Sequence, residues 1–348
     1  MDPTYPLAPV VNILAAFLVL LSLLSRSMIQ AWNAGIVLLG CWLFAYAMVI
    51  GVDTVIWADN ANNSAPIWCD IAIHVQVGAS VGVPACSLII ARRLYKIISR
   101  KTLGSADDRQ RAYNLAIDLL IGLGFPLIIM SLCKFFYIVQ AERFAIYEEA
   151  GCLGVIYSSG VAILIIIPWQ VGFSLITFLV YSPGILWLFL KRKRETDQLL
   201  QSNPTVPRST YFRVMTVGCI DVITTLPLSI VTTTRSLLQA IRNADGNFQF
   251  WPGWSAIHDD WTHSQLLVSD WKTDRWNELA IRSIIWNNVP LSLAYFFLFG
   301  LMGEARATYR NIFWAVVRPF RWIPSPPSDF GSMAFAPGHS SGRTIPST

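Results

Sequence analysis

Long apolar segments alternate with short polar ones along most of the chain. A helix needs about 20 consecutive, mostly apolar residues to cross a bilayer. Seven segments reach or exceed roughly that length: Leu7–Leu24, Ala34–Trp57, Ile71–Leu94, Leu115–Ile138, Val155–Leu190, Phe212–Leu237 and Leu279–Met302. The pattern predicts an all-α membrane protein, a bundle of seven transmembrane helices.

The fifth segment is too long for one crossing and too short for two crossings with a turn between them. Its first part, Val155–Ile167, is rich in β-branched residues and ends at Pro168. Because β-branched residues favour extended structure, we expect this part to be an apolar outer loop or strand. It would lead into one crossing at about Pro168–Leu190. An eight-helix arrangement is the alternative.

Basic residues gather in the loops at one end of the predicted helices. The segments Arg92–Arg111 and Lys191–Arg213, together with Arg26 and the carboxyl-terminal tail, hold 19 of the 26 cationic residues. The loops at the other end are acidic. Because cytosolic loops of membrane proteins carry the excess of Lys and Arg, we expect the amino terminus outside and the carboxyl terminus in the cytosol. This orientation requires an odd number of crossings, which favours seven.

The chain after the seventh segment divides into two parts. Residues 304–320 place apolar side chains near helical spacing among arginines, a pattern typical of an amphipathic helix on the inner leaflet. Residues 321–348 are rich in Pro, Ser and Gly and are expected to form a disordered cytosolic tail. The seven-helix domain would therefore cover residues 1–303.

Composition narrows the class of function. Hydrophobic residues make up 54% of the chain and charged residues only 14%, whereas soluble domains carry about 25% charged residues. This argues against a soluble enzyme and a nucleic-acid binder. The sequence has no phosphate-binding loop, catalytic Ser-His-Asp pattern or metal-binding helix motif, so we expect neither catalysis nor a cofactor. A transporter is an alternative, although internal repeats and midplane carboxylates, which would mark one, are lacking.

Two cysteines lie on the predicted outer side, Cys69 at the start of the third segment and Cys152 before the fifth. The outer compartment is oxidising, so we expect a disulfide that holds the outer loop over the mouth of the bundle. Two free thiols, or Cys133 as a competing partner, are the alternatives. Asn62-Asn63-Ser64 is a glycosylation sequon, and its closeness to the membrane disfavours occupancy of Asn62.

Four ionisable residues fall inside the predicted helices, where a charge is costly and is often functional. They are Asp53, Lys134 and Arg282 near the outer ends and Asp221 in the cytosolic half. Asp221 could pair with Arg92 or Arg93. All four could instead reach the membrane surface or form structural pairs.

The outer loop from Gln239 to Asn277 is unusually rich in tryptophan, with Trp251, Trp254, Trp261, Trp271 and Trp276. It could form an aromatic lid over an apolar ligand, or its indoles could lie on the outer membrane surface. His258 and His263 flank two aspartates, but their spacing matches no standard zinc motif. We therefore expect no metal site.

Several motifs, taken in order, resemble one receptor family. Trp68-Cys69-Asp70-Ile71, Gly82-Val83-Pro84-Ala85-Cys86 and Arg92-Arg93-Leu94 resemble the third helix of the fungal mating-pheromone receptors that bind lipidated peptides, class D of the G-protein-coupled receptors. Further likenesses lie at Phe189–Arg194, Asp221–Leu228 and Phe297–Tyr309. The resemblance extends from about residue 7 to about residue 310.

The resemblance implies a plasma-membrane receptor. An extracellular farnesylated peptide pheromone would bind among the helices and outer loops, and the receptor would activate a heterotrimeric G protein by nucleotide exchange. Gβγ, membrane lipids and a second receptor copy are further partners that it suggests, and nucleic acid is not. A divergent, non-mating member of the family is the alternative.

Candidate site residues follow from this reading. On the ligand side we expect pocket residues from the third helix and from the outer end of the seventh: Trp68, Asp70, His74, Gln76, Trp271, Trp276 and Arg282. On the cytosolic side we expect G-protein contacts from Arg92, Arg93, Lys193, Arg194 and Arg213. A basic cytosolic surface alone would place the same arginines and lysine there.

Overall fold

The computed structural model describes residues 5–25, 34–99, 108–132, 140–157, 159–191, 250–258, 262–301 and 309–310, with scattered residues between 216 and 241. The chain divides into two compact units, Met1–Tyr309 and Arg310–Thr348. The helices and strands below belong to the first unit. The expected helix over 304–320 lies outside the described residues except for Tyr309 and Arg310, and the tail lies outside them entirely.

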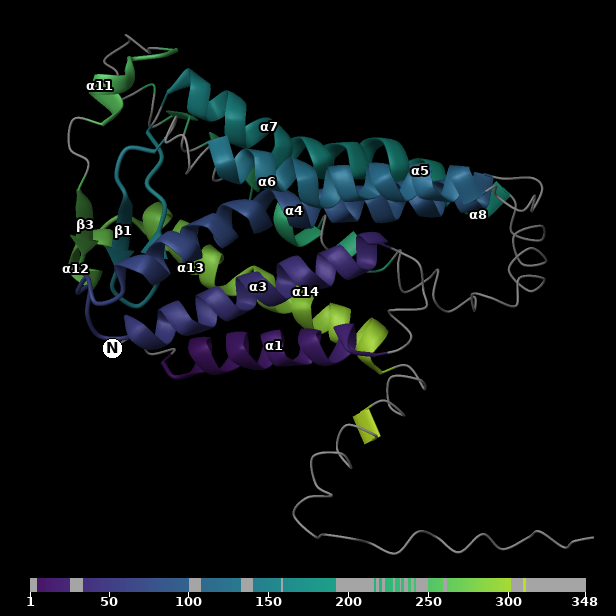
Figure 1. The fold of residues 1–348 in the computed structure, drawn as a ribbon. Coiled ribbons are helices and arrows are strands. Elements are labelled where there is room, and N and C mark those ends of the chain that lie inside the picture. Colours follow the sequence, from purple (N-terminus) through teal and green to yellow (C-terminus); the bar gives the residue numbers. More distant parts are fainter. Residues whose placement is uncertain are drawn as a thin grey trace, which may run out of the picture. The chain divides into compact units, whose positions relative to one another are not determined.

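Long helices run side by side along the first unit (Figure 1). Three of the predicted segments form single helices: α1 (Leu7–Leu23), α3 (Ala34–Ile56) and α4 (Pro66–Ser99). Two others combine α-helix with a π-helical turn: α5 (Asp108–Leu119), η1 (Leu120–Gly124) and α6 (Phe125–Met130), and then α13 (Arg275–Trp286), α14 (Asn288–Tyr295) and η4 (Phe296–Gly300). In the sixth segment the described residues are helical.

The fifth segment differs from the prediction. Its first residues are not helical, and Ile156 forms an isolated β-bridge with Gln140. From Gly160 the segment is helical, as α7 (Gly160–Ile176), η3 (Thr177–Tyr181) and α8 (Ser182–Lys191). The expectation of a loop or strand before Pro168 was therefore wrong over 160–167. Ser159 caps the helix by accepting a hydrogen bond from the Ala162 amide, and Pro168 lies inside it. Membrane helices tolerate such interruptions because neighbouring groups satisfy the freed backbone. From Gly160 on, the segment is one continuous helical run, which removes the reason for an eighth crossing.

Two of the π-helical turns come shortly before a proline. η1 ends at Gly124, two residues before Pro126, and η3 ends at Tyr181, two residues before Pro183. Proline lacks an amide hydrogen and its ring clashes with the carbonyl of the preceding turn. A wider π-helical turn relieves that clash without ending the helix, so the helix continues past the proline in both segments.

A small sheet closes one end of the bundle and was not predicted. β1 (Phe144–Tyr147) pairs antiparallel with β2 (Gly151–Leu153), with Ile146 opposite Cys152. β3 (His263–Leu266) pairs parallel with the other edge of β1, with Gln265 opposite Ile146. The order β2-β1-β3 joins the loop before the fifth segment to the loop before the seventh. Two short helices flank β3: α11 (Trp254–Ile257) and α12 (Val268–Trp271).

The core between α1, α3, α4 and the seventh segment depends on close approach at small residues. A β-carbon on Gly82 of α4 would lie 2.5 Å from the indole of Trp42, so only glycine lets that ring pack against the helix. The Trp42 indole then donates to the Gly122 carbonyl at 3.0 Å, which connects α3 to the fourth segment. Tyr295 is fully buried and donates to the Ile36 carbonyl at 3.1 Å.

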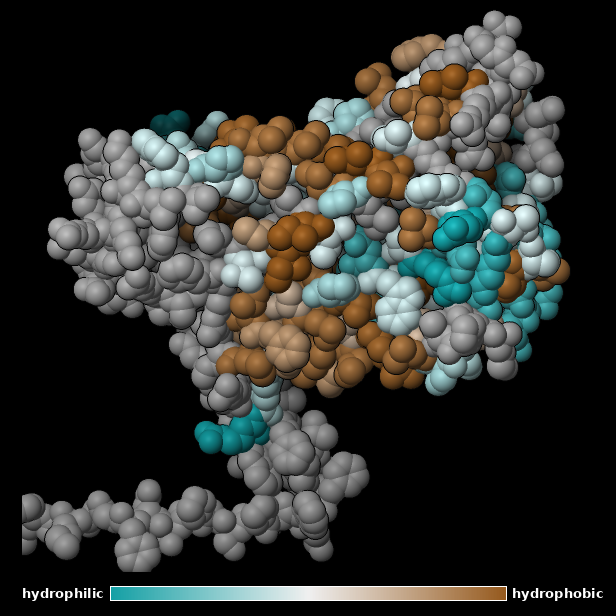
Figure 2. All heavy atoms as spheres, turned by 180° about the vertical axis from the view of Figure 1, so that it is seen from behind, coloured by the Kyte–Doolittle hydropathy of each residue, from teal (hydrophilic) through white to brown (hydrophobic). Residues whose placement is uncertain are grey.

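The outer surface of the bundle has the character expected in lipid. Among the described residues, four helical segments are long and apolar enough to cross a membrane, Ala34–Ile56, Pro66–Lys96, Arg109–Met130 and Arg275–Gly300, and Leu7–Leu23 and Val171–Ile185 are shorter apolar helices. Large apolar side chains such as Phe17, Leu120 and Leu179 are exposed. Figure 2 shows apolar residues over the middle of the bundle and hydrophilic ones at the end that carries the sheet. The protein is therefore a multi-pass membrane protein.

Candidate ligand-binding and coupling sites

We call the three-stranded sheet together with α12 the lid. Cys69, at the start of α4, forms a disulfide with Cys152 in β2, with the two α-carbons 5.3 Å apart. Both residues are fully buried. Cys133, the competing partner considered from the sequence, lies outside the described residues. The disulfide attaches β2, an edge strand of the lid, directly to the third transmembrane segment.

A buried carboxylate lies directly beneath the lid. Asp53 of α3 is fully buried, and its Oδ1 accepts a hydrogen bond of 2.6 Å from the Trp68 indole. Gln76 lies 3.4 Å from Oδ2 and donates to the Cys152 carbonyl at 2.9 Å. A buried charge is costly unless it is hydrogen-bonded. We call Asp53, Trp68 and Gln76 the polar node; it joins α3 and α4 to the lid.

Gly151 allows the lid to approach this node. Its φ is +88°, a left-handed conformation that favours glycine. A β-carbon there would lie 2.4 Å from the β-carbon of Asp53, closer than two carbon atoms can come. The turn between β1 and β2 can therefore rest on α3 only because residue 151 has no side chain.

Two glutamates in that turn bind the other half of the lid. The Glu148 carboxylate accepts a hydrogen bond of 3.0 Å from the Val268 amide. Glu149 accepts one of 2.7 Å from the Lys272 ammonium, and its side chain is only 5% exposed. Nearby in β1, burial and the negative charge of Glu142 raise the pKa of the Tyr147 phenol. These contacts make the two loops of the lid one structural unit.

The remaining ligand-side candidates are spread over the lid end of the bundle. Asp70 forms an ion pair of 2.7 Å with Arg143, and the imidazole of His74 lies 2.6 Å from the Asp70 carbonyl. Trp276 is 56% exposed. Arg282 pairs with Glu278 one turn earlier in α13, at 2.7 Å. The structure thus brings Trp68 and Gln76 together at Asp53 and places His74 next to Asp70. Trp276 and Arg282 lie on α13.

Trp271 does not lie on an open rim. It is 2% exposed and packs in a cluster with Ile281 and Ile285 of α13 and with Ile50 of α3. Among the described residues its indole N–H has no hydrogen-bond partner. The Lys272 ammonium lies 5.0 Å from its ring centroid. Trp271 therefore anchors α12 in the mouth of the bundle.

The two histidines make different contacts, and one of them meets the sequon. His258 stacks on Trp254 with ring centroids 4.2 Å apart, and His263 lies 3.4 Å from the Asn63 amide. No group of three or more potential ligand residues in the described part of the chain is placed to hold a metal ion. Asn62 is exposed, and its carbonyl accepts a hydrogen bond from the Trp57 indole.

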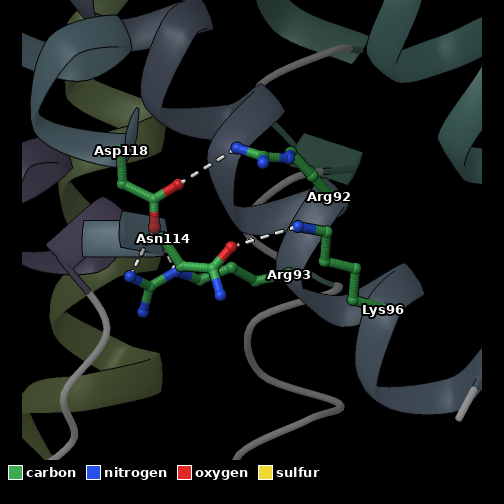
Figure 3. Close-up of polar contacts among 5 residues, drawn as sticks. All are labelled: Arg92, Arg93, Lys96, Asn114 and Asp118. Atoms are coloured by element: carbon green, nitrogen blue, oxygen red, sulfur yellow. Dashed lines mark hydrogen bonds and ion pairs between the residues drawn. The ribbon is translucent and has the colours of Figure 1, made fainter. Parts of the chain in front are cut away.

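The opposite end of the bundle carries the described basic candidates. Arg92 and Arg93 of α4 both contact Asp118 of α5, Arg92 at 3.5 Å, and the Lys96 ammonium lies 3.3 Å from the Asn114 side-chain oxygen (Figure 3). Asp118 is 1% exposed. Sequence reasoning missed it, although a carboxylate inside an apolar helix near a basic segment is a signal that could have found it. Asp221, Lys134, Lys193, Arg194 and Arg213 lie outside the described residues.

The fold defines the class of protein first. The chain is similar to the crystal structure of squid rhodopsin with a TM-score of 0.51 and 13% identity, covering 90% of this chain and 79% of that one. Rhodopsin is a seven-helix G-protein-coupled receptor. The likeness establishes the fold, and the predicted seven-transmembrane helix bundle is confirmed.

The family follows from sequence similarity. The chain belongs to the family of pheromone A receptors, whose pattern matches residues 7–319. It is 32% identical to the pheromone B alpha 2 receptor of Schizophyllum commune, over 93% of this chain and 48% of that protein. It is 28% identical to pheromone receptor 1 of Mycosarcoma maydis, over 88% and 83%, and 24% identical to the pheromone a factor receptor of Saccharomyces cerevisiae, over 80% and 55%.

The resemblance inferred from the third-helix motifs is therefore confirmed. The chain spans about half the length of its Schizophyllum relatives. Membership of a receptor family with this fold points to a receptor and away from an enzyme.

Proposed function

We propose that this protein is a plasma-membrane receptor for an extracellular farnesylated peptide mating pheromone, and that it activates a heterotrimeric G protein by nucleotide exchange. The match to the pheromone A receptor family over residues 7–319 is the observation that carries the proposal. In this proposal the lid faces outward and the basic end faces the cytosol, because the basic loops should remain inside.

Charge at the lid end supports a cationic ligand. The described lid-end segments, 57–70, 140–157, 250–258 and 262–282, contain eight carboxylates and four cationic side chains. An acidic surface attracts a basic peptide over distances near the Debye length. Burial of the lipid would add affinity of roughly 0.8 kcal/mol per CH₂. The two parts of the ligand would thus be recognised by different physical forces.

The ligand-side residues have different roles in this proposal. The exposed indole of Trp276 would contact the pheromone directly, together with Asp70, His74 and Arg282. Trp68 and Gln76 would act through the polar node, and Trp271 through its hold on α12. The lid is attached to α4 by the Cys69–Cys152 disulfide and to α13 by α12. Pheromone binding that shifts the lid would then move both helices.

At the basic end, Arg92 and Arg93 would contact the G protein together with Lys193, Arg194 and Arg213. Two of these positions are described, and their side chains are 21% and 23% exposed. A partner of acidic character fits such a surface.

Signalling in a fungal cell without its own pheromone receptors tests the proposal. Cells carrying a G-protein reporter and the full chain should respond to prenylated peptides from compatible mates. The same peptides without the farnesyl group should be at least about tenfold less potent, because the lipid contributes several CH₂ equivalents of burial. Receptor that reaches the cell surface and responds to none of the prenylated peptides would contradict the proposal.

A matched pair of variants tests the ligand side. Trp276→Ala should raise the half-maximal pheromone concentration about tenfold, which corresponds to about 1.4 kcal/mol of lost contact. Trp254→Ala is the control, since Trp254 is equally exposed, at 55% against 56%, and lies in α11 away from the expected site. Equal potency of the two variants, at equal surface levels, would remove Trp276 from the binding site.

A further inference from the structure

Two adjacent polar contacts hold α4 against α5 at the basic end. Asn114 and Asp118 are four residues apart in α5 and therefore lie one turn apart on the same face. In α4, Lys96 contacts Asn114, and Arg92 and Arg93 contact Asp118 (Figure 3). The three basic side chains point from one helix toward the polar pair on the other.

Burial within this cluster is unequal. The Asp118 side chain is 2% exposed, whereas those of Arg92 and Arg93 are 21% and 23% exposed. The carboxylate therefore lies inside, and the guanidinium groups lie between it and the surface. A buried carboxylate that loses its cations is strongly destabilised. A partner that binds the two arginines and draws them toward the surface therefore leaves the buried Asp118 carboxylate without its cations.

We propose that Asp118 is a positioning residue that holds Arg92 and Arg93 against α5 and thereby opposes their engagement by a cytosolic partner. This inference rests on the proposed function where it identifies that partner as the G protein. The partner must compete with Asp118 for the same guanidinium groups, so the contacts favour the uncoupled state. Removing the carboxylate charge lowers the cost of releasing the arginines.

Basal signalling is the first test. Asp118→Asn, which keeps the size of the side chain and removes its charge, should raise pheromone-independent reporter activity roughly fivefold at equal surface level, the change that about 1 kcal/mol gives. Asp118→Glu keeps the charge and should stay near the parent. Gln110→Ala, at an exposed position two turns earlier in α5, is the control and should leave basal activity unchanged. A fall in basal activity of Asp118→Asn, or an equal rise in Asp118→Glu, would overturn the proposal.

A second measurement needs neither pheromone nor G protein. The Lys96 ammonium and the Asn114 side-chain oxygen lie 3.3 Å apart. Because cysteine is much shorter than lysine, cysteines introduced by Lys96→Cys and Asn114→Cys should be joined by a bifunctional thiol reagent with a spacer rather than by direct oxidation. Such a reagent should cross-link α4 to α5 in isolated membranes. Adding Asp118→Asn should slow this cross-linking severalfold, and Asp118→Glu should not. Unchanged cross-linking would refute the positioning role of Asp118 even if the protein does signal. Slower cross-linking in a protein that answers no pheromone would keep that role and contradict the proposed function.

Discussion

At the scale of single residues, a few close contacts around Asp53 determine how the lid packs on the bundle. Asp53 accepts from Trp68, and Gly151 lies against the Asp53 β-carbon. Asp53 was identified from the sequence as a costly charge in a helix. Its partners were not identified, because hydrogen-bond geometry between residues 15 and 23 positions apart in sequence depends on how the two helices pack.

Gly151→Ala should destabilise the folded receptor by about 2 kcal/mol or more, because it adds backbone strain at positive φ and a collision with Asp53. Thermal unfolding of the detergent-solubilised protein measures the effect. Gly253→Ala is the control: its φ is +97°, but a β-carbon there meets nothing within 4 Å, so it carries the strain alone. Equal destabilisation by the two variants would show that the contact with Asp53 is unimportant.

A double-mutant cycle should find Asp53 and Trp68 coupled. Asp53→Ala and Trp68→Phe each remove one partner of the 2.6 Å hydrogen bond, and we expect a coupling energy of about 1.5–3 kcal/mol in unfolding experiments, typical of a hydrogen bond to a charged group. Trp42→Phe, whose indole bonds to Gly122 instead, should be additive with Asp53→Ala to within about 0.5 kcal/mol. If the effects of Asp53→Ala and Trp68→Phe on the free energy of unfolding were additive, the hydrogen bond between the two residues would not contribute to stability.

At the scale of elements, the lid combines segments that are far apart in sequence. β1 pairs with β2 a few residues later and with β3 more than a hundred residues later. The disulfide ties β2 to α4 across 83 residues. The helices were predictable because apolar length is a local property. The sheet was not, because its strands are four residues or fewer and carry no clear alternation.

Removing either cysteine should impair assembly equally. Cys69→Ala, Cys152→Ala and the double variant should each lower the surface level to the same extent, since one bond is lost in each case. Closing a loop of 83 residues stabilises the folded state by roughly 4.5 kcal/mol in the chain-entropy estimate. Surface labelling of intact cells measures the outcome. Cys41→Ala is the control, because Cys41 is a free, exposed cysteine. Unequal effects of the two single variants would argue against the pairing as the basis of assembly.

At the scale of the whole molecule, charge and hydrophobicity divide the protein into an acidic end with the lid, an apolar middle and a basic end. The middle follows from the apolar segments, and its exposed leucines and phenylalanines match a lipid environment. The direction in which the two ends face is a prediction from the Lys and Arg distribution.

Protease applied to intact cells should not cut the basic segment 100–107, which connects α4 to α5, because the proposed topology places it in the cytosol. The same protease should cut it in permeabilised cells, which serves as the control for accessibility. Fragment sizes on an immunoblot against a carboxyl-terminal tag distinguish the two cases. Cleavage at 100–107 in intact cells would show that the topology is the reverse of the one proposed, and that the lid is not on the ligand side.

The sequence by itself determined the class of fold and the family, because helix length, apolar periodicity and the third-helix motifs are properties of contiguous residues. It misjudged 160–167, where β-branched residues and a nearby proline suggested extended structure. The Ser159 cap and the need to satisfy backbone hydrogen bonds within an apolar segment favour a helix instead. The tertiary structure alone decided which charges meet. It paired Arg92 and Arg93 with Asp118, joined Trp68 and Gln76 at Asp53, and buried Trp271. Such contacts depend on helix rotation and loop pairing, which arise only when distant segments pack and which no local pattern encodes.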